Sequence, residues 1–407
     1  MINPIKNILL VIVSITIALL IAEITARLYL SDTNNAGSTG NVYKFHEFNS
    51  ELGWKNKANS YGFLEREEFT YKVNINSLGM RDKEISIDKP KGKQRIAVMG
   101  DSFTWGVGVA ESDRFTNILE NKSNGKYEVL NFGVSGYGPI QYLVQLDKIL
   151  KFNPDIVFLT FCLGNDFADN VFFQRYGYYK PFTILSDNPE IEIHGYPLPK
   201  IGQFYSYLKI PFLNNIFENS KLIYLTNLVL RNINTKQIGP SLFVYKNQKN
   251  FSQAGHIGAD EYQKDIYFPN HSPNAKLFSQ DMSDVNSKIL SKIKEKLELA
   301  NIEFLIVIIP TKCEYGACFP PYDYKKNNNA RNLLINNLQK YKISYFDPVD
   351  LINLNEFWLT DMHLRPSGHI KIADGILKAI NNEFWLTDMH LRPSGHIRIA
   401  DGISLYE

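Results

Sequence analysis

The sequence predicts an α/β fold in which a central parallel sheet lies between two layers of helices. Short, continuous runs of apolar and β-branched residues recur from Arg95 onward, and such runs are typical of strands that are buried on both faces of a sheet. Amphipathic helical patterns lie between these runs. Alternating strands and helices favour right-handed crossovers, which place helices on both faces of the sheet and give a three-layer α/β/α sandwich.

Five apolar runs are the predicted strands of this sheet. They are "RIAVMG" from Arg95, "YEVLNFG" from Tyr127, "DIVFLTFCLGND" from Asp155, "IEFLIVIIP" from Ile302 and the weaker "ISYFDP" from Ile343. Continuous runs of this kind suit strands that are buried on both faces of a parallel sheet.

Two helices are predicted between the strands. The first covers residues 139–152 and places Pro139 at its first position, where the missing N–H costs nothing. The second covers residues 283–300, with apolar residues at helical spacing and with Ser283 or Asp284 as the N-cap.

The core domain is expected to span residues 95–381. Residues 42–94 show no long periodic run and are expected to form short strands and turns that pack on the core. Residues 171–280 are rich in Tyr, Phe, Asn and Pro and are too long for an ordinary loop, so they are predicted to be an insertion. This insertion could either cover the sheet or bind substrate, and the sequence favours neither role.

The N-terminus carries a different signal. Residues 8–22 are apolar apart from Ser and Thr, and Lys6 precedes them. The positive-inside rule then predicts a single-pass inner-membrane anchor with the bulk of the chain outside the cytoplasm. A polar linker extends to residue 41, and residues 1–41 are expected to form the anchor and linker. A cleaved signal peptide and a buried core helix are the alternatives.

Charge and cysteine content narrow the class of protein. The formal net charge is +2, which gives no electrostatic reason to expect nucleic acid as a partner. Cys162 ends an apolar run and is expected to be a buried thiol. Cys313 and Cys318 could form a disulfide outside the cytoplasm, and they lack the second pair that a zinc site needs.

A near-identical repeat ends the chain. Residues 355–376 and 382–403 match at 21 of 22 positions. One pair of units is too few for a solenoid, so residues 382–407 are interpreted as a tandem duplication.

Residues whose side chains or backbone N–H groups can catalyse acyl transfer follow the predicted strands. Ser102 follows the first strand, Gly136 the second and Asn165 the third, while Asp361 and His363 follow the last. Strand ends meet at one edge of a parallel sheet. There the N–H groups of Ser102 and Gly136 and the Asn165 amide could form an oxyanion hole, and the Asp–His pair could supply an oriented base.

The order of these blocks resembles the SGNH hydrolases, also called GDSL-type esterases. The matching blocks are "GDSFTWG", "NFGVSGYG", "GND" and "DMHLRPSGH". The resemblance implies a flavodoxin-like sandwich in which Ser102 is the nucleophile, Gly136 and Asn165 complete the oxyanion hole, and Asp361 and His363 complete the triad. It covers residues 95–170 and 283–380.

One spacing departs from the common family pattern. That pattern is Asp-x-x-His, whereas here the spacing is Asp-x-His and Thr360 stands at the expected position. The shorter spacing is similar to that of the alginate O-acetyltransferases. An α/β-hydrolase is disfavoured because no G-x-S-x-G motif is present: Tyr137 replaces the last Gly in "GVSGYG".

The repeat offers a second pair, Asp388 and His390. We predict that the first copy, Asp361 and His363, is catalytic, because a short segment connects it to the last strand. The residues from Pro366 onward then form a closing helix. Exchange with the second copy remains conceivable, since extra loop length costs only about 1 kcal/mol.

Two further histidines could suggest a metal site. His369 and His396 each lie six residues after the triad-type histidine, and no carboxylate follows in a ligand pattern. They are therefore interpreted as structural residues, and neither a metal nor a cofactor is expected.

The predicted function is a membrane-anchored serine esterase that acts on an acyl ester of a cell-envelope glycan or lipid, with an O-acetyl group as one candidate. An O-acyltransferase would use the same residues to pass an acetyl group to a polysaccharide. A non-catalytic glycan-binding protein with the same fold is the third alternative.

Overall fold

The structure is a computed structural model, and it describes part of the chain. The described residues are 4–29, 35–170, 174–175, 178–183, 190–195, 198, 220, 222, 275–317, 324–381 and 396–398. The chain divides into two compact units: Met1–Asn35 with Lys200–His256, and Ala36–Pro199 with Ile257–Glu407. The sheet and the candidate site belong to the second unit.

The central sheet confirms the predicted fold class. Its five main strands are β7 (Tyr127–Asn131), β6 (Gln94–Met99), β8 (Ile156–Cys162), β11 (Glu303–Ile309) and β12 (Ser344–Asp347), in this spatial order. All neighbouring pairs are parallel. Numbered along the chain, the order is 2-1-3-4-5, the flavodoxin-like order, which places the reversal in strand order between β6 and β8.

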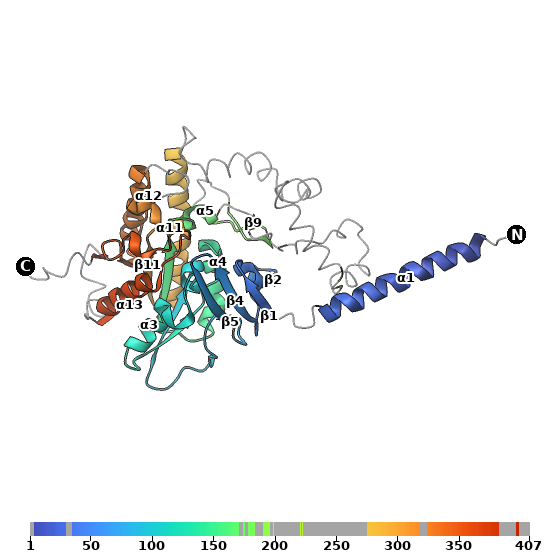
Figure 1. The fold of residues 1–407 in the computed structure, drawn as a ribbon. Helices are drawn as coiled ribbons and strands as arrows, with labels where there is room; N and C mark the ends of the chain where they lie inside the picture. Colours follow the sequence, from blue (N-terminus) through green and yellow to red (C-terminus); the bar gives the residue numbers. More distant parts are fainter. Residues whose placement is uncertain are drawn as a thin grey trace, which may run out of the picture. The chain divides into compact units, whose positions relative to one another are not determined.

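Helices cover both faces of this sheet (Figure 1). On one face lie α4 (Pro139–Leu150), α11 (Ala275–Leu299) and α12 (Tyr324–Lys340), and on the other α3 (Phe115–Lys122) and α13 (Pro366–Asn381). Successive strand residues alternate between the two faces. Ala97 packs in the apolar cluster on the side of α4, and Val98 packs in the cluster on the side of α3. This alternation requires both faces to be apolar, which explains the continuous apolar runs.

The predicted helix starts are right in one case and wrong in another. Pro139 is the first residue of α4, as its fixed φ favours. However, α11 begins at Ala275, so Ser283 and Asp284 lie inside the helix and are not its N-cap. The Ser283 hydroxyl accepts a hydrogen bond from the Asn337 side chain at 2.5 Å, which ties α11 to α12.

The N-terminal residues form two small sheets beside the core. One contains β1 (Asn35–Thr39), β4 (Tyr61–Arg66) and β5 (Phe69–Asn74), and the other pairs β2 (His46–Asn49) with β3 (Gly53–Asn56). Strand β1 lies within the stretch that was expected to be a polar linker. Apolar residues of β4 and β5 pack against Trp105 and Val107, which lie within about one and a half helical turns after the predicted nucleophile, Ser102, in sequence.

Shorter elements connect these parts. They are η1 (Val42–Phe45), α2 (Ser102–Trp105), η2 (Glu111–Asp113), α5 (Asp166–Asp169), β9 (Gln174–Arg175), β10 (Tyr178–Tyr179), η4 (Lys312–Tyr315) and η5 (Leu354–Glu356). Most of the predicted insertion 171–280 lies outside the described residues.

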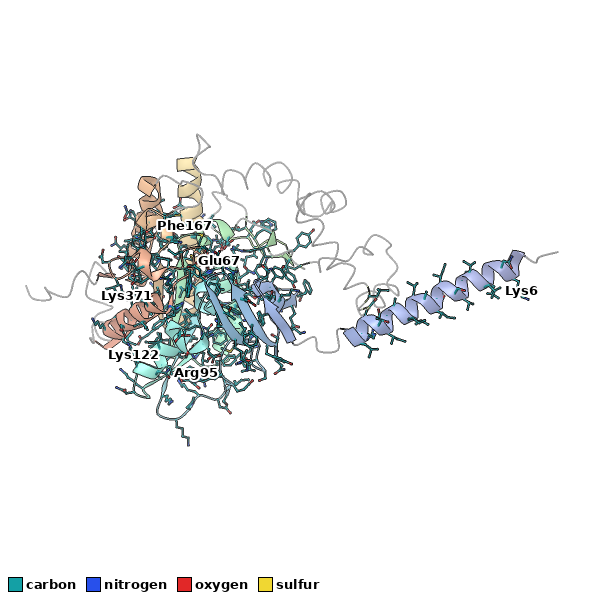
Figure 2. All side chains as sticks on the ribbon, in the orientation of Figure 1. Lys6, Glu67, Arg95, Lys122, Phe167 and Lys371 are labelled. Carbon is teal, nitrogen blue, oxygen red and sulfur yellow. The ribbon has the colours of Figure 1, made fainter. Side chains whose placement is uncertain are left out.

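Helix α1 (Pro4–Tyr29) carries the apolar N-terminal run, with Lys6 near its start (Figure 2). Within it, Leu9–Leu28 has a mean hydropathy of 2.5, long and apolar enough to cross a membrane. A signal sequence and a membrane anchor both have these properties.

The second repeat copy is described only at β13 (His396–Arg398). This strand pairs in parallel with the edge strand β12, with His396 opposite Tyr345. Of the cysteines, Cys162 is a free, buried thiol as expected, and Cys313 is disulfide-bonded. Cys318, the expected partner, lies outside the described residues.

Candidate active site

Ser102 lies at the carboxyl end of β6, where the chain turns into α2. Asp101 caps this short helix: its carboxylate accepts a hydrogen bond from the N–H of Phe103 at 2.9 Å. Ser102 is therefore the first helical residue and its hydroxyl is not needed as a cap. Gly100 is required just before it, because a Cβ there would lie 1.9 Å from the hydroxyl oxygen of Thr160.

A hydrogen-bonded chain connects Ser102 with the first repeat copy. The Nε2 atom of His363 lies 2.8 Å from Oγ of Ser102. Its Nδ1 atom lies 2.5 Å from Oδ1 of Asp361. The Phe103 ring packs beside the imidazole with a centroid separation of 4.9 Å. The structure thus brings together the three residues that the sequence predicts for a triad, in the order that proton transfer requires.

The Asp-x-His spacing has a local structural explanation. Oδ1 of Asp361 also accepts the backbone N–H of His363 at 2.9 Å. An aspartate that accepts the N–H two residues ahead forms an Asx turn. Only the Asp-x-His spacing makes that N–H the one of the histidine itself. The turn places Oδ1 beside the ring Nδ1 of His363. Thr360, at the position that the common family pattern would use, contacts Glu68 instead.

A cation from the N-terminal sheet contacts the other oxygen of this aspartate. Nη1 of Arg66 donates to Oδ2 of Asp361 in a close ion pair. Burial raises the pKa of Asp361, but the hydrogen bonds and charge of His363 and the charge of Arg66 outweigh it. The pKa therefore lies well below its usual value. The carboxylate is ionised throughout the neutral range, as an orienting group must be.

Two backbone N–H groups near Ser102 are available for an oxyanion. Gly136 has a φ of 80°, a left-handed conformation that suits glycine. Its loop is tied to the end of β6, because the N–H of Val134 donates to the Gly100 carbonyl at 3.1 Å. Among the described residues, neither the N–H of Ser102 nor that of Gly136 donates to another protein group.

Asn165 follows β8 as predicted, but its amide is directed by carboxylates. Nδ2 donates to Oδ2 of Asp169 at 2.7 Å and lies 3.4 Å from Oδ1 of Asp166. Burial raises the pKa of Asp101, next to the predicted nucleophile, and Asn165 is among the neighbours that oppose this rise. Free enzymes often hold catalytic donors in longer or diverted contacts. The amide would have to turn from these carboxylates when substrate binds, and its role as an oxyanion-hole donor stays a prediction.

Trp54, from the N-terminal part of the chain, holds the two residues that flank Gly136. The indole N–H of Trp54 donates to the carbonyl of Ser135 at 3.0 Å, and the Tyr137 hydroxyl donates to the Trp54 carbonyl at 2.5 Å. These contacts fix both neighbours of Gly136. A sequence pattern gives no sign of them, because the partners lie about 80 residues apart.

His369 is a packing residue on α13 in this structure. Its ring stacks on Phe115, and its Nδ1 accepts the backbone N–H of that residue at 3.3 Å. Burial, followed by the charge of Arg114, lowers its pKa to about 3. Within the described part of the chain, no group of three or more His, Cys, Asp or Glu side chains could hold a metal ion. Only the backbone of His396 is described.

The second candidate pair lies outside the described residues. Asp388 and His390 therefore have no position to compare with the first copy. The contact to Ser102 is made by His363.

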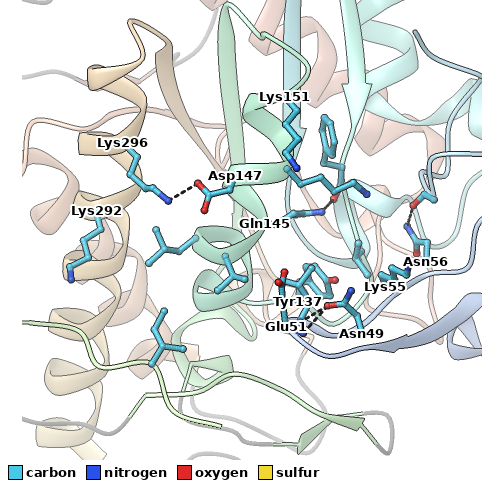
Figure 3. A pocket seen from close by; sticks show the side chains of 18 of the residues that line it. Asn49, Glu51, Lys55, Asn56, Tyr137, Gln145, Asp147, Lys151, Lys292 and Lys296 are labelled. Carbon is cyan, nitrogen blue, oxygen red and sulfur yellow. Dashed lines mark hydrogen bonds and ion pairs between the residues drawn. The ribbon is translucent and has the colours of Figure 1, made fainter. Parts of the chain in front are cut away.

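A separate cavity of about 1200 Å³ lies between β2–β3, α4 and α11 (Figure 3). None of the predicted site residues lines it. Lysines from α11 project toward it and are paired: Lys296 with Asp147 at 2.7 Å and Lys292 with Glu190 at 2.8 Å. These ion pairs leave little net charge to attract an anionic ligand, so the cavity adds nothing to the candidate site.

Comparison with known proteins decides the class of the site. Residues 98–194 match the GDSL-like Lipase/Acylhydrolase family. The chain contains a GDSL-type acylhydrolase domain. The match includes Ser102, Gly136 and Asn165, and it ends before the segment that carries Asp361 and His363. The protein is therefore a GDSL-type hydrolase that acts on ester bonds.

Solved structures with low sequence identity resemble the GDSL-type domain. A carbohydrate acetylesterase from Sinorhizobium meliloti is 11% identical, with a TM-score of 0.37, over 72% of this chain and 100% of its own. A psychrotrophic esterase from Pseudoalteromonas sp. is 10% identical, with a TM-score of 0.34, over 71% of this chain and 97% of its own. No curated protein matches the chain significantly.

Proposed function

We propose that this GDSL-type hydrolase is a membrane-anchored serine esterase that cleaves an acyl ester, such as an O-acetyl group, on a cell-envelope glycan or lipid. The observation that carries the proposal is the continuous chain from Oγ of Ser102 through His363 to Asp361, with contacts of 2.8 and 2.5 Å. A neutral imidazole whose far nitrogen is held by a carboxylate is the arrangement that activates a serine hydroxyl.

The reaction proceeds in two balanced halves. Oγ of Ser102 attacks the ester carbonyl while Nε2 of His363 accepts the hydroxyl proton. The tetrahedral oxygen receives hydrogen bonds from the N–H groups of Ser102 and Gly136, joined by the Asn165 amide. His363 then gives the proton to the departing alcohol, and an acyl-serine remains.

The acyl group is then transferred from Ser102 to water. His363 takes a proton from the water as it attacks, the bond to Ser102 breaks, and the serine oxygen recovers the proton. A sugar hydroxyl in place of water would make the same protein an O-acyltransferase. The active-site residues are shared by both reactions, so the acceptor decides between them.

A product assay separates these outcomes. Purified full-length protein in detergent is incubated with an O-acetylated oligosaccharide and an unacetylated one, and both free acetate and acetylated products are quantified. We expect release of acetate that depends on Ser102. Acetyl groups appearing on the second oligosaccharide without acetate would favour the transferase. Hydrolysis of p-nitrophenyl acetate without either product would remove the O-acetyl glycan as substrate.

The location rests on two independent features. Leu9–Leu28 is long enough to span a bilayer, and Lys6 before it favours a cytoplasmic N-terminus. The disulfide at Cys313 suits an oxidising compartment, whereas cytosolic proteins rarely keep disulfides. Both features fit an anchored protein whose catalytic domain lies outside the cytoplasm.

Fractionation of cells that express the chain tests the anchor. We expect the protein to remain in the membrane fraction and peptide mapping to recover its N-terminal peptide. Alkaline phosphatase fused after Glu407 should be active, since it requires export. A soluble product that begins beyond residue 30 would instead indicate a cleaved signal sequence, and an inactive phosphatase fusion would place the domain in the cytoplasm.

A further inference from the structure

The N-terminal β4–β5 hairpin reaches the loop that carries Asp361 and His363. We name residues 357–365 the triad loop. Arg66, the last residue of β4, and Glu68, which directly precedes β5, both contact this loop. The two segments lie about 295 residues apart in sequence, so the contact is a tertiary one.

Arg66 is itself held in place. Its Nε donates to the Gly40 carbonyl at 3.1 Å, and its guanidinium lies 5.9 Å from the centroid of the Phe69 ring. Its Nη1 is left to bind Oδ2 of Asp361, the oxygen that His363 does not use. Each oxygen of the carboxylate therefore has a defined partner, and the carboxylate plane is fixed by contacts from two directions.

Glu68 binds the backbone just before this aspartate. Its carboxylate accepts the N–H of Leu359 at 2.8 Å and the N–H of Thr360 at 2.5 Å. It also accepts the hydroxyl of Thr360 at 2.8 Å, and Nη2 of Arg365 lies 3.7 Å from it. These contacts replace the backbone partners that the loop would have if it were a strand or helix.

The triad loop has little regular structure of its own. A single isolated bridge, Phe357 to Leu364, closes it, and the N–H of Trp358 donates to the His363 carbonyl at 3.1 Å. From the core side, Nζ of Lys312 donates to the carbonyl of Leu359 at 2.7 Å. Among the described residues, the hairpin therefore supplies most of the side-chain hydrogen bonds that reach this loop from outside it.

We propose that Arg66 and Glu68 are positioning residues that set the geometry of the Asp361–His363 pair, so that the N-terminal hairpin is a working part of the active site. This inference rests on the proposed serine mechanism. Neither residue touches the reacting atoms. Arg66 fixes the orientation of the Asp361 carboxylate, and Glu68 fixes the backbone from which that side chain extends.

The expected consequence is kinetic. Without Arg66, Oδ2 of Asp361 loses its partner and the carboxylate can rotate away from Nδ1 of His363. Small misplacements of catalytic groups lower turnover by up to about 10²-fold. Substrate affinity does not depend on this contact, so kcat should fall and KM should change little.

Four variants of the full-length protein in detergent test this with p-nitrophenyl acetate. Arg66→Gln removes the cation, Arg66→Lys keeps it, and Glu68→Gln removes the anion. Glu67→Gln is the matched control, because Glu67 is an exposed neighbour at the tip of the same hairpin (Figure 2). We expect kcat to fall about 10- to 100-fold in Arg66→Gln and about 3- to 10-fold in Glu68→Gln. Arg66→Lys should recover part of the loss, and Glu67→Gln should match the wild type.

The split between kcat and KM, together with rescue by lysine, distinguishes positioning from mere structural support. Loss of a positioning contact lowers kcat in fully folded protein, and Arg66→Lys, which keeps a cation beside Asp361, should recover part of the loss. A loss of folded protein would instead lower the apparent kcat in proportion to the folded fraction, which circular dichroism measures.

Two results would overturn the inference. One is a kcat in Arg66→Gln and Glu68→Gln equal to that of Glu67→Gln. The other is an equal loss of kcat in Arg66→Gln and Arg66→Lys. Ser102→Ala in the same assay separates this failure from failure of the mechanism: an inactive Ser102→Ala beside a fully active Arg66→Gln removes only the role of the hairpin, whereas an active Ser102→Ala removes the serine mechanism. If Arg66→Gln lacks a wild-type circular dichroism spectrum, Arg66→Lys and Glu68→Gln carry the test.

Discussion

Replacing Ser102 with alanine should lower the kcat for p-nitrophenyl acetate by at least about 10³-fold. The loss of a triad member removes the covalent route and leaves only the contribution of the oxyanion hole and of binding. The hydroxyl of Ser102 lies 2.8 Å from Nε2 of His363, so its removal takes away the hydroxyl that this imidazole contacts. The KM should change much less, because alanine fits the same space.

The matched control is Ser112→Ala, since Ser112 is an exposed serine on η2. Its turnover should equal that of the wild type. Turnover in Ser102→Ala within about tenfold of the wild type, in protein with an unchanged circular dichroism spectrum, would contradict a serine nucleophile.

The repeat provides an internal control for the second large effect. His363→Ala should lower turnover by at least about 10³-fold, and His390→Ala, the same substitution at the corresponding position, should leave it unchanged. The reason is that the described contact to Ser102 comes from the first copy. Asp361→Asn and Asp388→Asn form a second matched pair, in which the first should again lose activity because the imidazole then takes the wrong tautomer.

Exchange between the copies is the competing outcome. If the second copy could replace the first, His363→Ala would keep much of its activity, and only the double variant His363→Ala/His390→Ala would be inactive. Measuring kcat for the three variants side by side decides between these cases. A loss in His390→Ala alone would show that the second copy is the working one.

The main sheet could be predicted because its strands are buried on both faces. Strand β8 is apolar except for Thr160 and β11 is apolar after Glu303, and this pattern follows directly from the packing of helices on both sides. Helix α12 gave no such signal. Its sequence is dominated by Asn and Lys, and among its described side chains the fully buried apolar ones are Leu334 and Leu338.

The positions of the candidate site residues could be predicted where these residues follow strands, and could not be predicted where they lie elsewhere. Ser102, Gly136 and Asn165 lie at the carboxyl ends of β6, β7 and β8, where the topology of a parallel sheet gathers them. Arg66 and Glu68 lie on a separate antiparallel hairpin, and nothing in their local sequence indicates that they meet a loop near residue 361.

The repeat shows how far local sequence falls short. Residues 369–371 are helical in α13, whereas the nearly identical residues 396–398 form strand β13 at the sheet edge. The two segments differ only by Lys371 in place of Arg398. Since the intrinsic preferences of the segments are almost equal, the surroundings decide: one segment packs on the face of the sheet and the other pairs with β12.

The most direct measurement of the central claim is labelling with a fluorophosphonate, followed by peptide mapping. An activated serine forms a bond to phosphorus and expels fluoride, whereas an ordinary serine does not react at a comparable rate. The account predicts one phosphonylated peptide that carries the label on Ser102, at full yield in His390→Ala and at greatly reduced yield in His363→Ala. A label on another residue, or undiminished labelling of Ser102 in His363→Ala, would contradict it.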